Sequence, residues 1–239
     1  MKNNKAMKKF IFVLLVTSGL MPEFSSAQFM FGPQAGLSYA TLTGTDFSLT
    51  PKVEWHAGLL FDLGFGKHFS LQPSLLYSKR GYKYDYQTYV TTIQDPDTIV
   101  TYTSANVDAN LGYIDIPVLL NIYFGDHQGF MLSAGPQLSI LLTNQSNAST
   151  VTKVSTINGV AQTSDPETET EFKFNPTDIS LVGGIGYKFP KLLLVYLRAS
   201  TGFGKVQKGN EGKNNFIQDD NAGHNFTFEI GAALTFGAK

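Results

Sequence analysis

Residues 114–124 read Ile-Asp-Ile-Pro-Val-Leu-Leu-Asn-Ile-Tyr-Phe, and this stretch decides the fold. Every even position, from Ile114 to Phe124, carries an apolar side chain, and the odd positions between them form a mostly polar face. A period of two is the pattern of a β-strand with one apolar face and one mostly polar face. The strand is long enough to cross a bilayer, because a tilted transmembrane strand needs about 9–11 residues.

The same alternation recurs along the chain. Strands are predicted at residues 29–39, 53–65, 68–84, 114–124, 129–142, 178–189, 191–203 and 224–236. Short turns alternate with long polar connections, as they do in bacterial outer-membrane barrels, where the short turns face the periplasm. We therefore predict an all-β fold: an eight-stranded antiparallel up-and-down transmembrane β-barrel with short periplasmic turns and long extracellular loops.

Two of the long connections, residues 85–110 and 143–177, are expected to contain hairpins that extend the strands above the membrane. In the second of them, residues 151–157 and 160–163 flank Asn158-Gly159. An Asn-Gly pair between β-prone segments is a strong signal for a type I′ hairpin turn.

The first 27 residues resemble a cleaved secretion signal. Four lysines precede the apolar run Phe10–Val16, and Ser25 and Ala27 occupy the small-residue positions of a signal-peptidase site. The apolar run is too short for a transmembrane anchor. We therefore expect a signal peptide at residues 1–27, an outer-membrane β-barrel domain at residues 28–239, and localisation in the cell outer membrane.

The composition excludes several classes of protein. Charged residues make up 15% of the chain, against roughly 25% in soluble proteins. The mean hydropathy of −0.06 argues against a helical membrane protein, and the chain shows no basic patch that would bind nucleic acid. Cysteine is absent, which excludes disulfides, an acylated lipoprotein cysteine and thiolate chemistry.

A soluble lipocalin-type barrel is the main structural alternative. Its apolar strand faces point inward and its outer surface must be well charged. Here the polar faces are instead rich in Gly, Ser, Thr and Gln, which suits the crowded inside of a narrow barrel. Aromatic residues also gather near the strand ends, as in the two interfacial girdles of membrane barrels. These features favour apolar faces that contact lipid.

Seven ionisable residues fall on the faces predicted to line the barrel. They are Glu54, His56, Asp62, Arg80, Asp115, Arg198 and Glu229. Arg198 and Glu229 lie on neighbouring strands, so a buried pair is expected there. A narrow barrel fills its centre with side chains and must pair the charges it buries. We interpret the set as a structural charge network and favour this over a catalytic or proton-conducting role.

No motif predicts catalysis, a metal site or a cofactor. The four histidines lie on separate elements without ligand-pair spacing, and no nucleophile motif such as GxSxG occurs. The acidic clusters at residues 95–97 and 219–221 lack EF-hand spacing and are interpreted as solvated turns. We expect a non-enzyme without metal or cofactor. The alternative is an enzyme that modifies outer-membrane lipid through His56 and a serine.

Five tyrosines are predicted to extend toward the cell surface: Tyr82, Tyr84, Tyr86, Tyr89 and Tyr102. An upper aromatic girdle with a β-hairpin is the favoured interpretation, and a binding surface for a glycan or protein is the alternative. The expected partners are outer-membrane lipids and lipopolysaccharide, together with an envelope or extracellular protein or glycan that the loops would bind.

The chain resembles the PorT-like outer-membrane β-barrel proteins of Bacteroidetes. The blocks that carry the resemblance are residues 26–28, 31–37, 71–81, 113–120 and 134–138, of which Tyr-Ile-Asp-Ile-Pro at residues 113–117 is the most specific. The resemblance implies an outer-membrane barrel, usually of undefined activity, and supplies no catalytic residues. A few relatives take part in protein secretion or gliding. We therefore expect a structural or surface-binding protein, with an accessory role in secretion as a further alternative.

Overall fold

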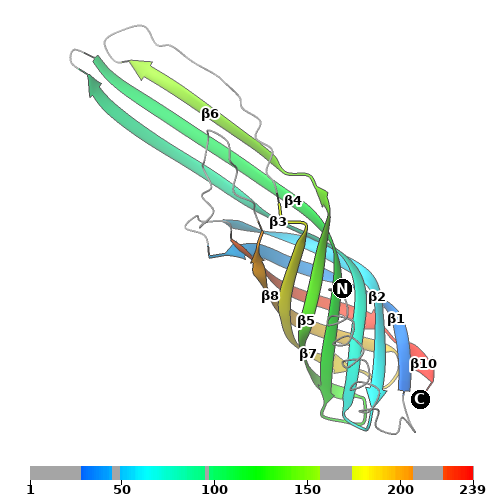
Figure 1. The fold of residues 1–239 in the computed structure, drawn as a ribbon. Coiled ribbons are helices and arrows are strands. Elements are labelled where there is room, and N and C mark those ends of the chain that lie inside the picture. Colours follow the sequence, from blue (N-terminus) through cyan, green and yellow to red (C-terminus); the bar gives the residue numbers. More distant parts are fainter. Residues whose placement is uncertain (1–27, 45–48, 95–96, 157–173, 207–222, 239) are drawn as a thin grey trace, which may run out of the picture.

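The structure is a computed structural model and describes residues 28–44, 49–94, 97–156, 174–206 and 223–238. It consists of antiparallel strands, drawn in Figure 1. These are β1 (Gln28–Thr43), β2 (Thr50–Phe65), β3 (Phe69–Gln94), β4 (Asp97–Tyr123), β5 (Gly129–Asn144), β6 (Asn147–Thr156), β7 (Thr177–Lys188), β8 (Leu193–Lys205), β9 (His224–Leu234) and β10 (Phe236–Ala238). Within the described ranges, no helix has the length and hydropathy that crossing a membrane would require.

The strands close into a barrel. Neighbours follow the order β1, β2, β3, β4, β5, β7, β8, β9, and β9 pairs back onto β1 from Gln34↔Ala233 to Thr43↔His224. The short β10 follows β9 after Thr235 and pairs with residues 29–31 of β1. β9 and β10 together therefore form the eighth strand of the wall. The predicted eight-stranded antiparallel up-and-down barrel is confirmed, and the predicted strand positions lie within or close to the observed ones.

The apolar faces of the strands point away from the barrel interior. Leu37, Ile185 and Ile230 are each more than half exposed, although they lie in the middle of their strands. On β4 the exposed Ile122 stands between the buried Asn121 and Tyr123. An outer surface covered with large apolar side chains is stable against hydrocarbon and not against water. The lipocalin-type alternative, which needs the opposite orientation, is therefore wrong.

The two ends of the barrel differ. At one end, tight connections at residues 66–68, 124–128 and 189–192 join the strands, and we call this the short-turn end. Gly66 has a φ of +64° there, a left-handed conformation that glycine adopts at little cost. The opposite end, which we call the long-loop end, carries the long connections, as predicted.

β3 and β4 continue far beyond the barrel wall (Figure 1). Pairing of β2 with β3 ends at Thr50↔Lys83, whereas β3 and β4 stay paired out to Gln94↔Asp97. β6 adds to the far side of β4 from Ile99↔Thr156 to Asp108↔Asn147. We call residues 84–94, 97–107 and 147–156 the protruding sheet. The hairpin expected within residues 85–110 is confirmed, and it turns most of that connection into strand.

Several predicted features lie outside the described residues. They are the signal peptide at residues 1–27, the Asn158-Gly159 turn, residues 95–96 of the first acidic cluster and the whole of the second one at residues 219–221.

The seam between β1 and β9 depends on two facing glycines, Gly36 and Gly231. A Cβ added at Gly36 would lie 2.3 Å from the carbonyl oxygen of Ile230 and 2.7 Å from Cε1 of His56. Real Cβ atoms do not approach so closely. The small residues predicted to line the interior therefore allow the first and last strands to meet while the lumen stays filled.

Candidate functional site

The lumen is filled by side chains in layers. Near the short-turn end lies an apolar cluster of Leu60, Tyr123, Met131, Leu194, Tyr196 and Ala233. Near the long-loop end lies a second cluster of Leu42, Tyr82, Ala109, Leu111, Tyr113, Phe174 and Val206. Polar and charged side chains occupy the space between them. An eight-stranded barrel has an interior just wide enough for this filling, which leaves no open channel.

Arg80 and Asp115 form the central ion pair of the polar layer. Nη2 of Arg80 on β3 donates to Oδ2 of Asp115 on β4 at 2.6 Å, and the two side chains are 3% and 1% exposed. The guanidinium also lies 4.9 Å from the ring of Tyr113. Two charges this deeply buried are stable only when they are paired and hydrogen-bonded.

Arg198 on β8 binds an amide and not an acid. Its Nη2 donates to Oε1 of Gln72 at 2.7 Å, and its guanidinium lies 4.0 Å from the ring of Tyr196. Glu229 faces Arg198 in the strand register and is buried, but among the described residues no ion pair joins them. The direct Arg198–Glu229 pair expected from the sequence is therefore wrong. Arg198 stacks on Tyr196 and reaches across the lumen to β3.

His56 on β2 lies at the centre of a hydroxyl–imidazole–hydroxyl chain. Its Nδ1 is 2.8 Å from Oγ of Ser38 on β1, and its Nε2 is 2.9 Å from the hydroxyl of Tyr196 on β8. Ser38 and His56 are each 1% exposed. A serine–histidine contact is thus present, but it lies inside the barrel and the wall separates it from lipid.

Asp62 pairs with a lysine that the sequence analysis did not single out. Nζ of Lys188 on β7 lies 3.3 Å from Oδ2 of Asp62 on β2, and the hydroxyl of Tyr123 donates to the same oxygen at 3.1 Å. The ammonium is 5.6 Å from the Tyr123 ring. Within the described part of the chain, the three buried cations, Arg80, Lys188 and Arg198, therefore each combine a polar partner with an aromatic ring.

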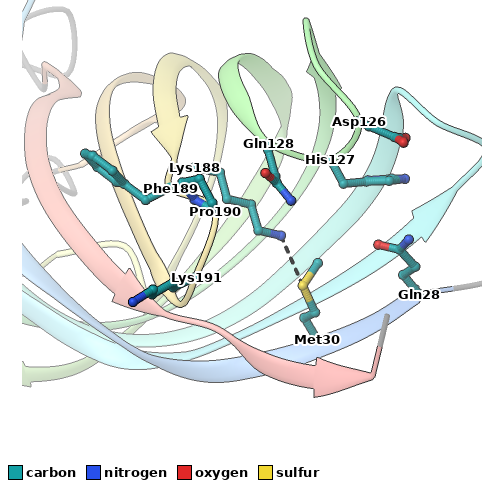
Figure 2. Close-up of a pocket in the computed structure, with 9 residues that line it drawn as sticks. All are labelled: Gln28, Met30, Asp126, His127, Gln128, Lys188, Phe189, Pro190 and Lys191. Atoms are coloured by element: carbon teal, nitrogen blue, oxygen red, sulfur yellow. Dashed lines mark hydrogen bonds between the residues drawn. The ribbon is translucent and has the colours of Figure 1, made fainter.

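A pocket of about 210 Å³ opens at the short-turn end beside Lys188. Figure 2 shows Lys188 Nζ directed at the sulfur of Met30, 3.1 Å away, with the side chains of the turns around it. The lining residues are Gln28, Met30, Asp126, His127, Gln128, Lys188, Phe189, Pro190 and Lys191. Lys188 is already paired with Asp62, and the other two charged side chains of the lining, Asp126 and Lys191, carry opposite signs. The pocket therefore presents no excess of either charge to a ligand.

Six of the seven predicted interior residues are buried in the lumen, whereas the seventh is only half-buried. His56, Asp62, Arg80, Asp115, Arg198 and Glu229 are all buried. Glu54 is half-buried near the long-loop end, and no ion pair of the described part of the chain includes it.

Sequence reasoning missed Lys188 and Asp178. Asp178 is buried on β7 and accepts hydrogen bonds from the Gly204 N–H and from Nδ2 of Asn225, both at 3.0 Å. Both residues have even numbers, as do Ser180 and Val182, which are buried between them on the inner face of β7. Following the strand alternation to both ends of this segment would have found them. In the described part of the chain, no cluster of histidine and acidic residues has a metal-binding arrangement.

A second charged cluster lies outside the barrel wall, at the base of the protruding sheet. Lys52 hydrogen-bonds to Asp108 and to Oδ1 of Asn110, the latter at 2.6 Å, and Lys83 Nζ lies 3.7 Å from Asp108. Partial burial works against ionisation of Asp108. The hydrogen bond and charge of Lys52, assisted by Lys83, outweigh it and hold the pKa of Asp108 below its usual value.

The five predicted surface tyrosines divide into two groups. Tyr82 belongs to the apolar cluster inside the long-loop end, and Tyr84 is half-buried. Tyr89 and Tyr102 face each other on the protruding sheet with ring centroids 4.8 Å apart, and Tyr89 is 70% exposed. The Tyr86 side chain lies outside the described part. The described tyrosines thus form an inner cap and an exposed aromatic pair.

Comparison with known proteins gives one family and several solved structures. The family described as "Outer membrane protein beta-barrel domain" matches residues 23–208. No curated protein sequence matches the chain. The similar structures include Ail, the attachment invasion locus protein of Yersinia pestis, at 11% identity over 88% of this chain and 99% of that one, with a TM-score of 0.42.

Two further solved structures resemble the chain. OprG from Pseudomonas aeruginosa is 12% identical over 89% of this chain and 97% of that one, with a TM-score of 0.39. Neisserial surface protein A is 11% identical over 87% of this chain and 97% of that one, with a TM-score of 0.36.

Proposed function

The chain belongs to the outer membrane protein beta-barrel domain family and is a protein of the outer membrane, and from this premise we propose that it is a PorT-like, non-enzymatic barrel that presents a binding surface outside the cell. The short-turn end faces the periplasm and the long-loop end faces the outside, as in other bacterial barrels. Residues 1–27 direct the chain across the inner membrane and are removed.

One observation carries this proposal: the lumen is closed while a sheet extends far beyond the wall. Between Tyr84↔Val107 and Gln94↔Asp97 the protruding sheet is paired without a break, which at about 3.3 Å per residue corresponds to roughly 35 Å. A barrel that only anchors itself needs no such extension. A rigid sheet with an exposed aromatic pair is suited to contact a protein or a glycan.

The buried serine–histidine contact supports a structural role and not catalysis. A lipid substrate would have to reach Ser38 through the barrel wall or through one of the two apolar clusters. In addition, His56 already contacts hydroxyl groups through both ring nitrogens. The proposal therefore assigns His56 to the filling of the lumen.

Outer-membrane lipids and lipopolysaccharide are the remaining proposed partners. The outward-facing Lys79 lies 5.8 Å from the ring of Trp55 near the long-loop end, and Lys83 follows four residues later on the same face. Aromatic and basic side chains at this level match the interface of a membrane that carries anionic head groups.

Surface labelling tests the proposal, because the chain contains no cysteine of its own. Tyr89→Cys on the protruding sheet is expected to react with a membrane-impermeant maleimide on intact cells. The matched control Asp126→Cys, in a short turn, is expected to react only after the outer membrane has been permeabilised. Labelling of Asp126→Cys on intact cells, with Tyr89→Cys protected, would reverse the orientation and refute the proposal.

A further inference from the structure

Among the residues that the structure describes, the protruding sheet has an open edge along β3. Within the barrel wall β3 has β2 on one side and β4 on the other, but its pairing with β2 ends at Thr50↔Lys83. From Tyr86 to Gln94 its described strand partner is β4 alone. In a β-strand, successive residues direct their N–H and C=O groups to opposite edges. Every second residue of this stretch therefore turns its backbone polar groups to the open side.

This edge lacks the usual protection against pairing. Natural sheets protect exposed edges with charges, prolines, bulges or very short strands. Residues 86–94 read Tyr-Gln-Thr-Tyr-Val-Thr-Thr-Ile-Gln and contain no charged residue, no proline and no glycine. The stretch is dominated by β-branched and aromatic residues, which favour the extended conformation. It is thus a long, uncharged row of backbone donors and acceptors.

The opposite edge of the β3–β4 hairpin, which lies along β4, shows what kind of segment pairs with an exposed row of backbone donors and acceptors. β6 pairs antiparallel with β4 over its whole length, Asn147–Thr156. Its sequence, Asn-Ala-Ser-Thr-Val-Thr-Lys-Val-Ser-Thr, is rich in Thr, Ser and Val and carries a single charge. A segment of this composition therefore adds to the hairpin by backbone pairing, and the β3 edge offers the same chemistry on the other side.

We propose that the open edge of β3, residues 86–94, binds an extended segment of another polypeptide by antiparallel strand addition, and that this segment is weakly charged and rich in Thr, Ser and Val. Backbone hydrogen bonds supply the affinity, and side chains beside the exposed Tyr89 supply the selectivity. The inference rests on the proposed function, because it requires that the sheet be exposed outside the cell.

A second copy of the chain fits this edge less well. Copies inserted in one membrane all direct β3 outward from the wall, so two β3 edges would meet in parallel. The hairpin pairs antiparallel with β6, and parallel pairing is slightly less stable per residue. A separate extended polypeptide carries no such restriction on its direction.

Amide hydrogen exchange of the full-length mature protein in lipid nanodiscs tests the proposal. The probe is a synthetic peptide with the sequence of residues 147–156. We expect the peptide to slow the exchange of alternate amides in residues 86–94 at least tenfold, while amides of residues 99–108, which are paired with β6, stay unchanged. A copy of the peptide N-methylated at the four consecutive residues 150–153 lacks donors on both edges and is expected to give no protection.

Two proline variants locate the binding edge. Thr91→Pro and Thr92→Pro remove N–H groups that point to opposite sides of β3. One variant is expected to weaken the β3–β4 pairing, and the other to leave that pairing intact but abolish protection by the peptide. The proposal is overturned if the peptide slows amide exchange nowhere along the β3 edge of the wild-type protein. It is equally overturned if the N-methylated copy slows this exchange as strongly as the unmodified peptide. It is also overturned if both proline variants bind like wild type.

Two further results separate this inference from its premise. If Tyr89→Cys is labelled on intact cells but the peptide does not protect β3, the surface presentation stands and the strand addition is wrong. If Thr91→Cys instead gives a disulfide-linked dimer on mild oxidation in the membrane, and the peptide does not compete with it, the occupant is a second copy and the proposal is overturned.

Discussion

Removing Arg80 is expected to destabilise the barrel strongly, because Asp115 would lose its main partner. Arg80 Nη2 donates to Oδ2 of Asp115 at 2.6 Å, whereas Oδ1 has no hydrogen-bond partner among the described residues. In Arg80→Met the carboxylate is left unpaired at a position that is 1% exposed. Breaking a buried pair in this way costs about 3–5 kcal/mol, which corresponds to a more than hundredfold change in the unfolding equilibrium.

A double-mutant cycle separates the pair from other losses. In Arg80→Met/Asp115→Leu both charges are gone, so we expect the double variant to be more stable than Arg80→Met alone. Lys83→Met is the matched control, since the Lys83–Asp108 pair is long and more than half exposed on the lysine side. We expect that variant to cost no more than about 1 kcal/mol.

Urea unfolding in lipid vesicles measures these differences. The single tryptophan, Trp55, faces outward and reports the change through its fluorescence, and the heat-modifiable mobility of the folded barrel on SDS gels gives a second readout. The reasoning fails if Arg80→Met unfolds within about 1 kcal/mol of wild type, the range of an exposed pair. It also fails if the double variant shows the sum of the two single losses.

Further predictions concern the seam, the lumen and the base of the sheet. Gly36→Val should prevent closure and abolish the heat-modifiable band, whereas Gly183→Ala, where an added Cβ meets nothing within 4 Å, should keep it. Purified wild-type protein in planar bilayers should show no stable stepwise conductance, and steps would contradict the filled lumen. His56→Ala should leave lipid A and phospholipid species unchanged in mass spectra of overexpressing cells, and a changed pattern would favour a lipid-modifying enzyme. The lowered pKa of Asp108 means that its contribution is present above the unfolded value of about 3.9 and is lost as pH falls through the folded value. Amides near residue 108 should therefore exchange faster only below about pH 4, an effect that Asp108→Asn should remove.

The architecture could be predicted because one physical rule governs the whole wall. Alternation assigns each side chain to lipid or to the lumen, so a residue such as Asn121 could be placed inside without knowing its neighbours. The same rule covers Lys188 and Asp178, which were missed because the alternation was not followed to the strand ends.

Partners across the lumen could not be predicted in the same way. Strand order places Glu229 beside Arg198, but the direction of a long side chain depends on the rings and amides that fill the barrel. Arg198 lies over Tyr196 and reaches Gln72, which is 126 positions away in the chain.

The length of the protruding sheet could not be predicted from the sequence either. A Thr- and Tyr-rich connection has no lipid-facing alternation to mark where the wall ends.

The seam between β1 and β9 sets the order of assembly. It joins residues such as Thr43 and His224, so the contact order of the wall is high and its last step must await the C-terminal strand. The contact of His56 with Tyr196 spans 140 positions and forms only once β2 and β8 face each other across the lumen. A chain truncated before residue 224 would lack β9 and would leave the facing edges of β1 and β8 unpaired in hydrocarbon, so stable insertion requires that the ring be closed.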